Sequence, residues 1–371
     1  MTKNDFAELQ KEKNDACISI IVPTHRISPD RRTDEPVLKK AVIQAKQLLK
    51  QKYSNEIIAA LENKLDDLLR SIDFLHNKQG LGLFVSSSMQ KVVRFPFEVK
   101  GQVVVKKSFE LRDLLFLNNY NSDYYLLEMN EKSARLFKGR IDELEEIEDE
   151  NFPQKHEELF EYSRPSRGSS YLGNAVVKDF ERDKSVMEEI RMKEFLHSVD
   201  KLLAKYLKPD SFFVLSGTEK DVAIFKAVSK HVKNIIGIIP GNETYITTHE
   251  LGSLAWFRMW SYIDNKKFEL IKTYEEKVGE GLGVEGIAKV WEAAKAGRGL
   301  RLLVEKDYVM PAFIEDADNS LHLNKPATKN TEMPDSVENI IETVLNKDGD
   351  VFMMENDSLA GHQRIALITR Y

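Results

Sequence analysis

The sequence predicts a multidomain protein of mixed class, α+β at its N-terminal end and α/β beyond it. The length of 371 residues is enough for two or three hydrophobic cores. Short apolar strands alternate with amphipathic helices along the chain. Residues 212–217, 219–231 and 235–241 read as a strand, a helix and a strand, which is typical of a parallel pair. We therefore expect three domains, at residues 1–120, 121–264 and 265–371.

The first domain is expected to open with a buried strand at residues 18–23. A polar loop, 24–36, then leads into a helix from Val37 to about Lys52. Ser54 is a suitable N-cap for a second helix, whose apolar residues recur every three to four positions and for which Gly80 is the expected stop. Strands are predicted to follow at 81–85, 91–95 and 102–105. These elements define an α+β module.

The second domain is expected to start with two alternating strands, 124–129 and 134–139. A strongly acidic stretch, 142–150, and a loop, 161–174, separate them from a long amphipathic helix. That helix is predicted from about Ala175 to Tyr206 and is followed by the strand-helix-strand unit. A further helix is predicted at residues 250–263.

The third domain is expected to be a small α/β sandwich. A helix at 284–296 and a strand at 300–304 come first, and a polar stretch, 315–335, is expected to be a loop. A second helix at 336–346 precedes two closing strands. Helices that alternate with short strands in this way favour a compact α/β fold.

Composition and charge exclude several classes of protein. The net charge of −6 argues against a protein that coats nucleic acid nonspecifically, although local basic patches are compatible with it. We find no signal-peptide pattern at the start and no run near the roughly 18 apolar residues of a membrane helix. The single cysteine, Cys17, excludes an internal disulfide and a multi-thiolate zinc site. The expectation is a soluble, cytoplasmic protein without a membrane partner.

A glycine pattern in the third domain raises the possibility of a cofactor site. Gly281, Gly283 and Gly286 match the dinucleotide-binding G-x-G-x-x-G, and Glu305 stands at the acidic position downstream. In such sites the first glycine directly follows a strand. Here a polar, irregular segment, 272–280, separates Gly281 from the candidate strand at 268–271. The spacing therefore favours a structural loop entering a helix, and a dinucleotide-dependent enzyme stays as an alternative.

Other motifs give no catalytic constellation. Thr218 stands at a strand-to-helix turn that could bind phosphate, but Asp221 three residues on makes a capping box with it. The eight histidines show no metal-binding spacing, Cys17 adjoins a buried strand, and Glu128 lacks companion acids for a two-metal site. We therefore expect no cofactor, no metal and no catalytic residues, with an RNA or peptidyl-tRNA hydrolase as a further alternative.

Three segments carry a resemblance to a known family: Pro-Thr-His-Arg at 23–26, the glycine-rich segment 283–305 and the ending 352–371. With the domain order, they resemble Pelota and the class-one release factors, and above all their bacterial archaeo-eukaryotic release-factor-like relatives, which include the hibernation factor Balon. The resemblance implies a three-domain architecture with a ribonuclease-H-like middle domain. It also implies a ribosome-binding protein, with a translational GTPase as a partner by analogy only.

The sequence departs from the release factors at their catalytic tip. Those factors carry Gly-Gly-Gln before the long central helix, whereas this chain has Ser-Arg-Pro-Ser-Arg-Gly-Ser-Ser-Tyr-Leu-Gly-Asn at 163–174. The first domain also lacks the stop-codon-reading Asn-Ile-Lys-Ser. The resemblance thus implies a noncatalytic factor that binds the ribosomal A site, in hibernation or in rescue.

Two groups of residues are predicted to contact ribosomal RNA. In the loop before the long helix, near the peptidyl-transferase centre, these are Arg164, Arg167, Gly168 and Ser169. In the first domain, against small-subunit RNA, they are Arg26, Arg31, Arg32, Lys39 and Lys40.

Overall fold

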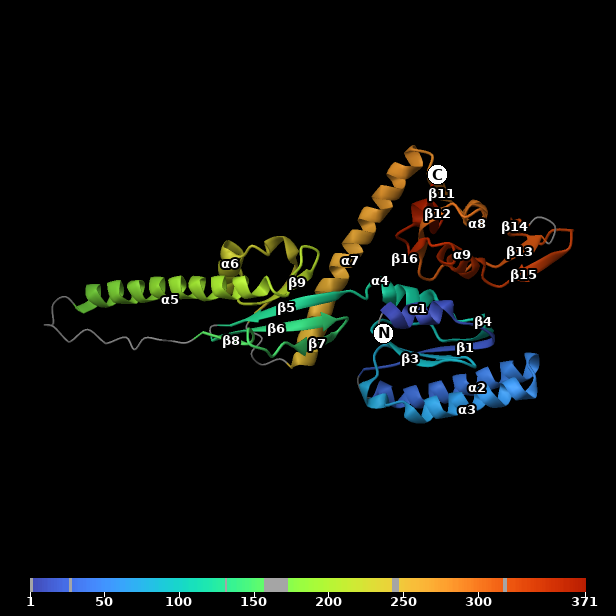
Figure 1. The fold of residues 1–371 in the computed structure, drawn as a ribbon, viewed down its shortest axis with the longest axis horizontal. Coiled ribbons are helices and arrows are strands. Elements are labelled where there is room, and N and C mark those ends of the chain that lie inside the picture. The colour runs from blue at the N-terminus through green and yellow to red at the C-terminus, as the bar shows by residue number, and fades with distance from the viewer. Residues whose placement is uncertain (1–2, 27–28, 131, 157–172, 242–246, 316–318) are drawn as a thin grey trace. The chain divides into compact units, whose positions relative to one another are not determined.

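The computed structural model describes residues 3–26, 29–130, 132–156, 173–241, 247–315 and 319–371 (Figure 1). The chain forms two compact units, one made of Met1–Asn121 with Asn265–Tyr371 and the other of Ser122–Asp264. Both contain helices and sheets, so the predicted mixed class is confirmed. The division into three domains stays a prediction.

An antiparallel sheet forms the centre of residues 1–121. Its strands are β1 (Lys13–Pro23), β2 (Gly80–Val85), β3 (Gln90–Phe95) and β4 (Gln102–Ser108), in the order β3-β2-β1-β4. Helices α2 (Asp34–Lys52) and α3 (Asn55–Ser71) cover one face, and α1 (Lys3–Lys11) lies on the other side (Figure 1). The predicted strands are therefore present, each with one to five additional residues.

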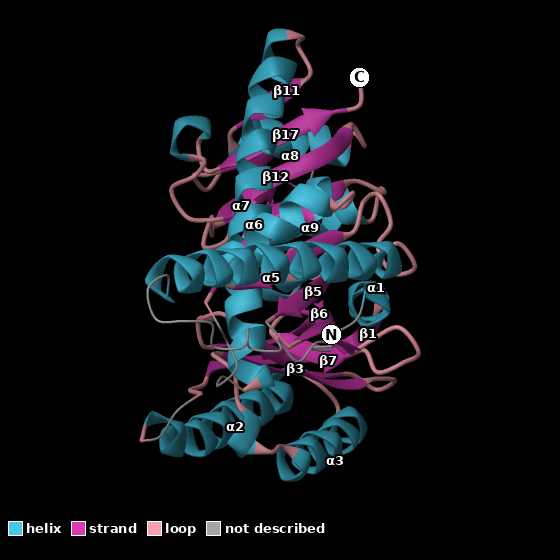
Figure 2. Cartoon of the chain, turned by 90° about the vertical axis from the view of Figure 1, so that its left-hand side faces the viewer, coloured by secondary structure: helices cyan, strands magenta, loops and turns pink. Residues whose placement is uncertain are grey.

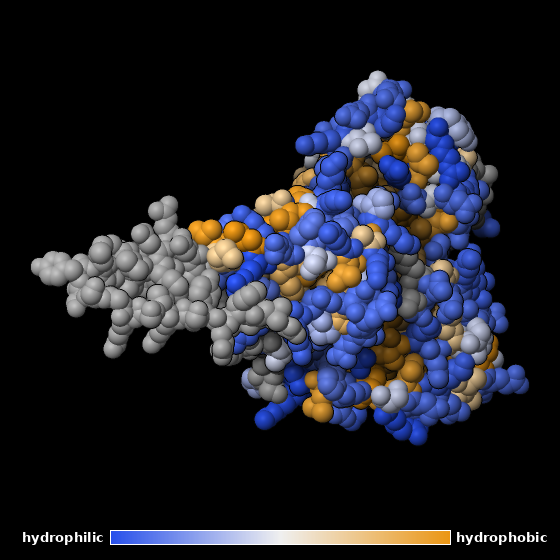
Figure 3. All heavy atoms as spheres, turned by 60° about the vertical axis from the view of Figure 1, so that its left-hand side comes forward, coloured by the Kyte–Doolittle hydropathy of each residue, from blue (hydrophilic) through white to orange (hydrophobic). Residues whose placement is uncertain are grey.

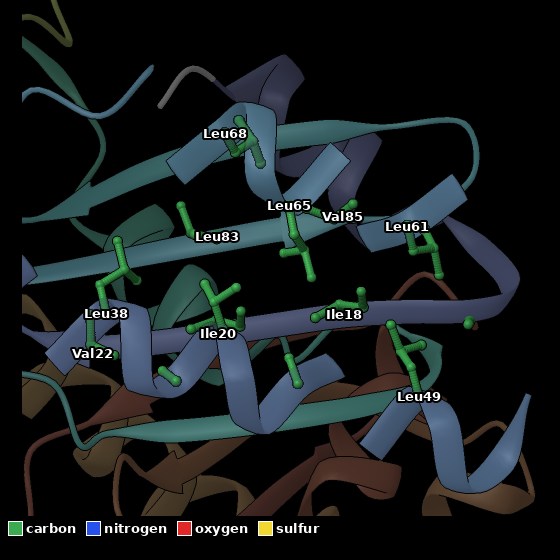
Figure 4. Close-up of a cluster of buried hydrophobic side chains, with 14 of the residues drawn as sticks. Ile18, Ile20, Val22, Leu38, Leu49, Leu61, Leu65, Leu68, Leu83 and Val85 are labelled. Carbon is green, nitrogen blue, oxygen red and sulfur yellow. The ribbon is translucent and has the colours of Figure 1, made fainter. Parts of the chain in front are cut away.

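The core of this sheet follows from the alternation along β1. Ile18, Ile20 and Val22 are two residues apart, so they share one face of the strand. They point toward the helices, among Leu38 and Leu49 of α2 and the α3 leucines (Figure 4). Each of these aliphatic side chains is buried, and full burial of one contributes about 1.5–3 kcal/mol to the folded state.

Gly80 is not the stop of α3, which corrects the sequence prediction. The helix ends at Ser71, and Ile72 is already extended. Gly80 instead begins β2, where an added Cβ would lie 2.6 Å from a Val99 methyl. The start of the preceding helix also differs, because α2 begins at Asp34 rather than Val37 and tolerates Pro36 in its first turn. A short 3₁₀ helix, η1 (Asp30–Thr33), precedes it.

Residues 122–264 build a mixed sheet. Its strands are β5 (Asp123–Met129), β6 (Ser133–Arg140), β7 (Glu143–Glu146), β9 (Phe212–Gly217) and β10 (Ile235–Pro240), in the order β10-β9-β5-β6-β7, with β8 (Gln154–Lys155) on β6. The pairs β5–β9 and β9–β10 are parallel. The strand-helix-strand prediction is thus confirmed, with α6 (Glu219–Val228) as its helix.

Two long helices begin in this region, and the second continues beyond Asp264 into residues of the other unit. Helix α5 (Gly173–Leu203) lies beside α6, and both views show them together (Figures 1 and 2). Helix α7 (Thr248–Gly279) is continuous over 32 residues, so the expected strand at 268–271 and the irregular segment after it are wrong. No glycine or proline interrupts residues 253–278, and Leu270, Ile271 and Tyr274 keep a helical spacing against a core cluster.

Residues 283–369 form two further sheets. The first has β11 (Gly283–Glu285), β17 (Ile365–Thr369), β12 (Gly299–Glu305) and β16 (Asp350–Met354) in that order, with α8 (Ile287–Lys295) and α9 (Ser336–Leu345). The second has the order β14-β13-β15, from β14 (Leu321–His322), β13 (Ala312–Glu315) and β15 (Asn330–Met333). The polar stretch 315–335 is therefore not only loop, because Leu321 and Met333 are buried in this small sheet.

The surface of the described residues is largely hydrophilic on the face drawn in Figure 3, and its hydrophobic groups are separated from one another. Within the described ranges, no helix combines the length and the apolar character that crossing a bilayer requires.

Candidate nucleic-acid interface

The two predicted groups of RNA-contacting residues have different outcomes. Arg164, Arg167, Gly168 and Ser169 lie outside the described residues, so their role stays a prediction. The five cations of the other group are described, and all lie between the end of β1 and the second turn of α2: Arg26, Arg31, Arg32, Lys39 and Lys40.

The chain leaves β1 along a fixed path. Pro23 is the last strand residue and pairs with Gly80. The Thr24 amide then donates a hydrogen bond to the Gln79 carbonyl at 3.1 Å, and its hydroxyl donates to the Lys78 carbonyl at 2.9 Å. Because Thr24 is buried and both of its donors are bonded, the residues after it start from a defined position.

The carboxylate of Asp34 closes the loop that starts at Thr24. Its Oδ2 accepts hydrogen bonds from the His25 amide at 3.0 Å and from Asn77 Nδ2 at 2.6 Å. Its Oδ1 lies 2.8 Å from Nδ1 of His25. The Asp34 side chain is fully buried, and a buried carboxylate is stable only when such partners compensate for lost water. Asp34 therefore ties β1, α2 and the segment before β2 to one point.

This contact brings the predicted arginines to one loop. Arg26 follows His25 directly, while Arg31 and Arg32 lie in η1, just before Asp34. Arg26 and Arg31 are partly buried and Arg32 is exposed. The contact between His25 and Asp34 therefore has Arg26 next to one of its residues in the chain and Arg31 and Arg32 shortly before the other.

The two lysines lie farther along, on exposed positions of α2. Lys39 Nζ is 2.6 Å from Glu35 Oε1, an exposed i,i+4 pair of the kind that contributes only about 0.3–0.5 kcal/mol. Residues 24–40 carry five Lys and Arg against three Asp and Glu, a net charge of +2, whereas the whole chain has −6. The segment is thus a locally positive region of an acidic protein, and it can attract phosphates.

The glycines of segment 281–286 each have a structural role. Helix α7, not a strand, precedes this segment. Gly281 and Gly286 have φ angles of +78° and +80°, which favour glycine, and an added Cβ on Gly286 would lie 2.7 Å from Gln363 Oε1. Gly283 belongs to β11, where a Cβ would clash with a methyl of Val278. Each glycine therefore has a conformational or packing role of its own.

Glu305, the residue at the position of a ribose-binding acid, is fully buried. Its Oε2 accepts a hydrogen bond from Nε of Arg364 at 2.6 Å, and its Oε1 accepts one from the Leu359 amide at 3.0 Å. Both carboxylate oxygens are thus occupied by partners that hold the turn before β17. This arrangement leaves the carboxylate of Glu305 engaged within the protein, which weighs against a ribose-binding role for it.

The remaining candidate groups also have structural partners. The Thr218 hydroxyl accepts a hydrogen bond from the Asp221 amide at 3.2 Å, so the predicted cap is confirmed. Burial raises the pKa of Cys17 to about 11, which makes its thiol a poor nucleophile. Within the described ranges, no cluster of three or more His, Cys, Asp or Glu is placed to hold a metal ion.

Sequence reasoning missed a Ser-Asp-His cluster in the second unit. The buried Asp200 accepts hydrogen bonds from the Ser229 hydroxyl at 2.5 Å and the Lys230 amide at 3.1 Å, and lies 2.8 Å from His231 Nδ1. In a hydrolase the serine would bond to the imidazole rather than to the carboxylate. This cluster therefore fixes the turn after α6. The spacing Ser229-x-His231 is too common a pattern to have revealed it.

Comparison with known proteins gives one family. Residues 123–298 match the model described as bacterial archaeo-eukaryotic release factor family 3. No curated protein matches in sequence.

Several solved structures match along most of this chain. Pelota of Archaeoglobus fulgidus is 13% identical, with a TM-score of 0.41 and coverage of 99% of this chain and 92% of that one. Dom34 of S. cerevisiae, a translation termination-like factor, is 11% identical, with a TM-score of 0.37 and coverage of 74% and 75%. The archaeal translation termination factor aRF1 is 15% identical, with a TM-score of 0.24 and coverage of 100% and 99%. All three TM-scores are below 0.5, so the function of this chain is argued from the family match and from contacts within the chain.

Proposed function

We propose that this chain, a member of the bacterial archaeo-eukaryotic release factor family, is a translation factor that binds the ribosome without releasing the nascent peptide. We place its binding site in the ribosomal A site and its role in the protection of idle ribosomes or the handling of stalled ones. Such a role is cytoplasmic and needs no cofactor.

The family match, together with the missing catalytic tip, carries the proposal. The matched residues, 123–298, cover the unit Ser122–Asp264 except for its first residue. We call it the middle unit, because the resemblance makes it the counterpart of the domain in which release factors present their peptide-releasing loop. This chain contains no Gly-Gly-Gln at any position. A protein that keeps the family's middle unit but lacks the group that positions the attacking water is suited to occupying the site rather than to hydrolysis.

The local charge supports RNA as the ligand. Most of the attraction between proteins and nucleic acids comes from phosphate contacts by Lys and Arg. The segment that Asp34 closes carries Arg26, Arg31 and Arg32, and its net charge is opposite in sign to that of the chain. We propose that this segment contacts small-subunit RNA, and that Arg164 and Arg167 contact RNA of the large subunit.

A translational GTPase is the protein partner that we propose for residues 265–371. The support is the resemblance of this region to the corresponding part of the family. The interaction would be measured by cosedimentation of the chain with ribosomes in the presence and absence of GTP-bound elongation factors.

Cosedimentation with ribosomes tests the main proposal. The tagged chain would be centrifuged through sucrose with ribosomes from growing and from starved cells, at several salt concentrations. We expect it in the ribosome fraction, more strongly with the vacant ribosomes of starved cells, and we expect salt to weaken the binding. If the chain stays in the supernatant with both preparations at low salt, the proposed function is wrong.

A further inference from the structure

We propose that His25 is an additional RNA-contacting residue and that the buried Asp34 is the residue that positions it. This inference rests on the proposed ribosome binding, and it assigns the ribose–phosphate backbone as the ligand of the outer ring nitrogen of His25.

Asp34 fixes both the main chain and the ring of His25. One carboxylate oxygen accepts from the backbone amide at 3.0 Å, and the other lies 2.8 Å from Nδ1 of the imidazole. Asn77, on a different segment, donates to the same carboxylate at 2.6 Å. Because the backbone amide and the ring of His25 contact the two oxygens of one buried carboxylate, the ring is oriented relative to its own main chain.

The exposure of the pair is strongly asymmetric. The Asp34 side chain is 0% exposed, whereas the His25 side chain is 46% exposed. Since the Nδ1 edge of the ring faces the buried carboxylate, the exposed edge is the opposite one, which carries Nε2. A carboxylate that engages one nitrogen of a histidine determines what the other nitrogen can present, and proteins use this arrangement to aim an imidazole at a ligand.

The surroundings of His25 select the kind of ligand. The charged residues of its own segment are the cations Arg26, Arg31 and Arg32 and the acids Asp30, Asp34 and Glu35. Asp34 is buried and already bonded, whereas Asp30 and Glu35 are exposed. The three arginines and these two acids leave the segment around the ring with a net charge of +1. A ring nitrogen there can hydrogen-bond a phosphate oxygen or a ribose 2′-hydroxyl, the backbone groups by which proteins are positioned on RNA.

A role restricted to folding does not require this ring contact. The buried Asp34 already receives the His25 amide and the Asn77 amide group, which join the three segments. The additional contact to Nδ1 immobilises a side chain that is nearly half exposed, and immobilising an exposed side chain costs conformational entropy. The geometry is that of a side chain held in place to contact a ligand at the surface.

A double-mutant cycle between the two residues tests the inference. We would measure ribosome cosedimentation for H25A, D34N and the double variant, beside a thermal melt of each. H25A removes one directional hydrogen bond to RNA, so we expect its affinity for the ribosome to fall by about 3- to 10-fold. If Asp34 acts through His25, D34N weakens binding by a similar factor in the wild-type background and has no further effect in the H25A background.

An exposed Asp–His pair in the same unit provides a matched control. Asp73 Oδ2 lies 2.5 Å from His76 Nδ1, and these side chains are 49% and 80% exposed. D73N and H76A remove the same chemical groups without a buried anchor, so we expect them to leave ribosome binding unchanged.

The outcomes separate this inference from the proposed function. A wild-type chain that does not bind ribosomes overturns the proposed function. If the wild type binds and H25A binds equally well, the inference is wrong, and this result is independent of D34N because H25A replaces an exposed ring. D34N could also weaken ribosome binding of the H25A variant by the same factor as that of the wild type. Asp34 would then act on the whole segment rather than through His25, and the inference would be wrong.

Discussion

The ammonium of Lys106, at the end of β4, lies 3.5 Å from Oε1 of Glu338 in the first turn of α9. The same Nζ is 3.3 Å from Oε2 of Glu110 and 3.3 Å from Oε1 of Glu342. One cation thus faces three carboxylates inside the unit formed by residues 1–121 and 265–371. The pairing links the two parts of that unit through charged side chains.

Glu338 is the most deeply buried member of this group. Its Oε1 accepts a hydrogen bond from the Leu111 amide at 3.0 Å, while its Oε2 has no hydrogen-bond partner among the described residues. Burial, with the neighbouring Glu110, raises the pKa of Glu338 to about 8 against the lowering effect of Lys106 and Arg112. Burial likewise raises the pKa of Asp113, at the start of the neighbouring helix α4 (Arg112–Asn119), to about 6.

From the raised pKa values of these two acids we predict that the fold is less stable in alkaline than in acidic solution. An acid whose pKa is higher in the folded than in the unfolded state binds more protons when folded. The free energy of unfolding therefore falls as the pH rises from the unfolded value of 4.5 through about 8 for Glu338. Replacing Glu338 by Gln keeps an acceptor for the Leu111 amide and removes this titration. We expect E338Q to melt higher than the wild type at pH 9, by roughly 2–4 °C if 1 kcal/mol is regained.

The neighbouring Glu342 provides the control for this prediction. It faces the same lysine but is 25% exposed, compared with 6% for Glu338. E342Q should therefore retain the fall in melting temperature between pH 6 and pH 9, and E338Q should lose much of it. An unchanged pH dependence in E338Q would show that Glu338 is not the titrating group.

Elements with a regular hydrophobic period can be predicted from the sequence. The alternation of Ile18, Ile20 and Val22 indicates β1, and the apolar spacing of α3 indicates a helix. In the second half of α7 the helical spacing rests on only three residues, Leu270, Ile271 and Tyr274. The polar residues of its exposed face, between 272 and 280, make this short signal easy to miss. The sheet β14-β13-β15 also escapes prediction, because its strands are two to four residues long and mostly polar.

The candidate site is predictable only in part. The basic residues near Arg31 stand out in the sequence, since local charge requires no knowledge of the fold. The hydrogen bond between Asn77 and Asp34, by contrast, joins residues 43 positions apart. Their contact depends on the antiparallel pairing of β1 with β2, which brings Gly80 beside Pro23. Long-range polar contacts of this kind leave no periodic signal in a single sequence.

We predict that the Gly281 loop binds no dinucleotide. Its glycines satisfy backbone and packing requirements, and the carboxylate of Glu305 is held by Arg364 and the Leu359 amide. Calorimetric titration with oxidised and reduced nicotinamide and flavin cofactors should show no saturable heat. Micromolar affinity for any of these cofactors would restore the enzyme alternative.

We predict that the purified chain does not release nascent peptide. Without Gly-Gly-Gln, no group of the known kind positions water at the peptidyl-tRNA ester. Ribosomes carrying labelled peptidyl-tRNA, at a stop codon or elsewhere, should retain the label at the background rate after addition of the chain, while a release factor frees it. Release above background that a substitution at Arg164 or Arg167 abolishes would contradict the noncatalytic proposal.

We also predict specific charge contacts to RNA. Arg164 and Arg167 flank Pro165 and precede Gly168 in the sequence, which gives two cations on a segment that can approach RNA closely. If each neutralises one phosphate, R164A with R167A should weaken ribosome binding and reduce the slope of log affinity against log salt by roughly 2 in magnitude. The double variant R31A/R32A tests the loop closed by Asp34 in the same way. We expect the same reduction, roughly 2, in its slope of log affinity against log salt.

A matched pair of cations distinguishes contact from general attraction. Lys266 and Lys277 on α7 form exposed ion pairs with Glu269 and Glu280 at 2.9 and 2.6 Å, and they lie outside both predicted groups. K266A with K277A removes the same net charge, so an effect of overall charge would weaken binding equally in all three double variants. A contact at the proposed sites weakens binding in the arginine variants alone, with unchanged thermal melts. Equal slopes for the wild type and an arginine variant would show that the arginines removed do not touch RNA.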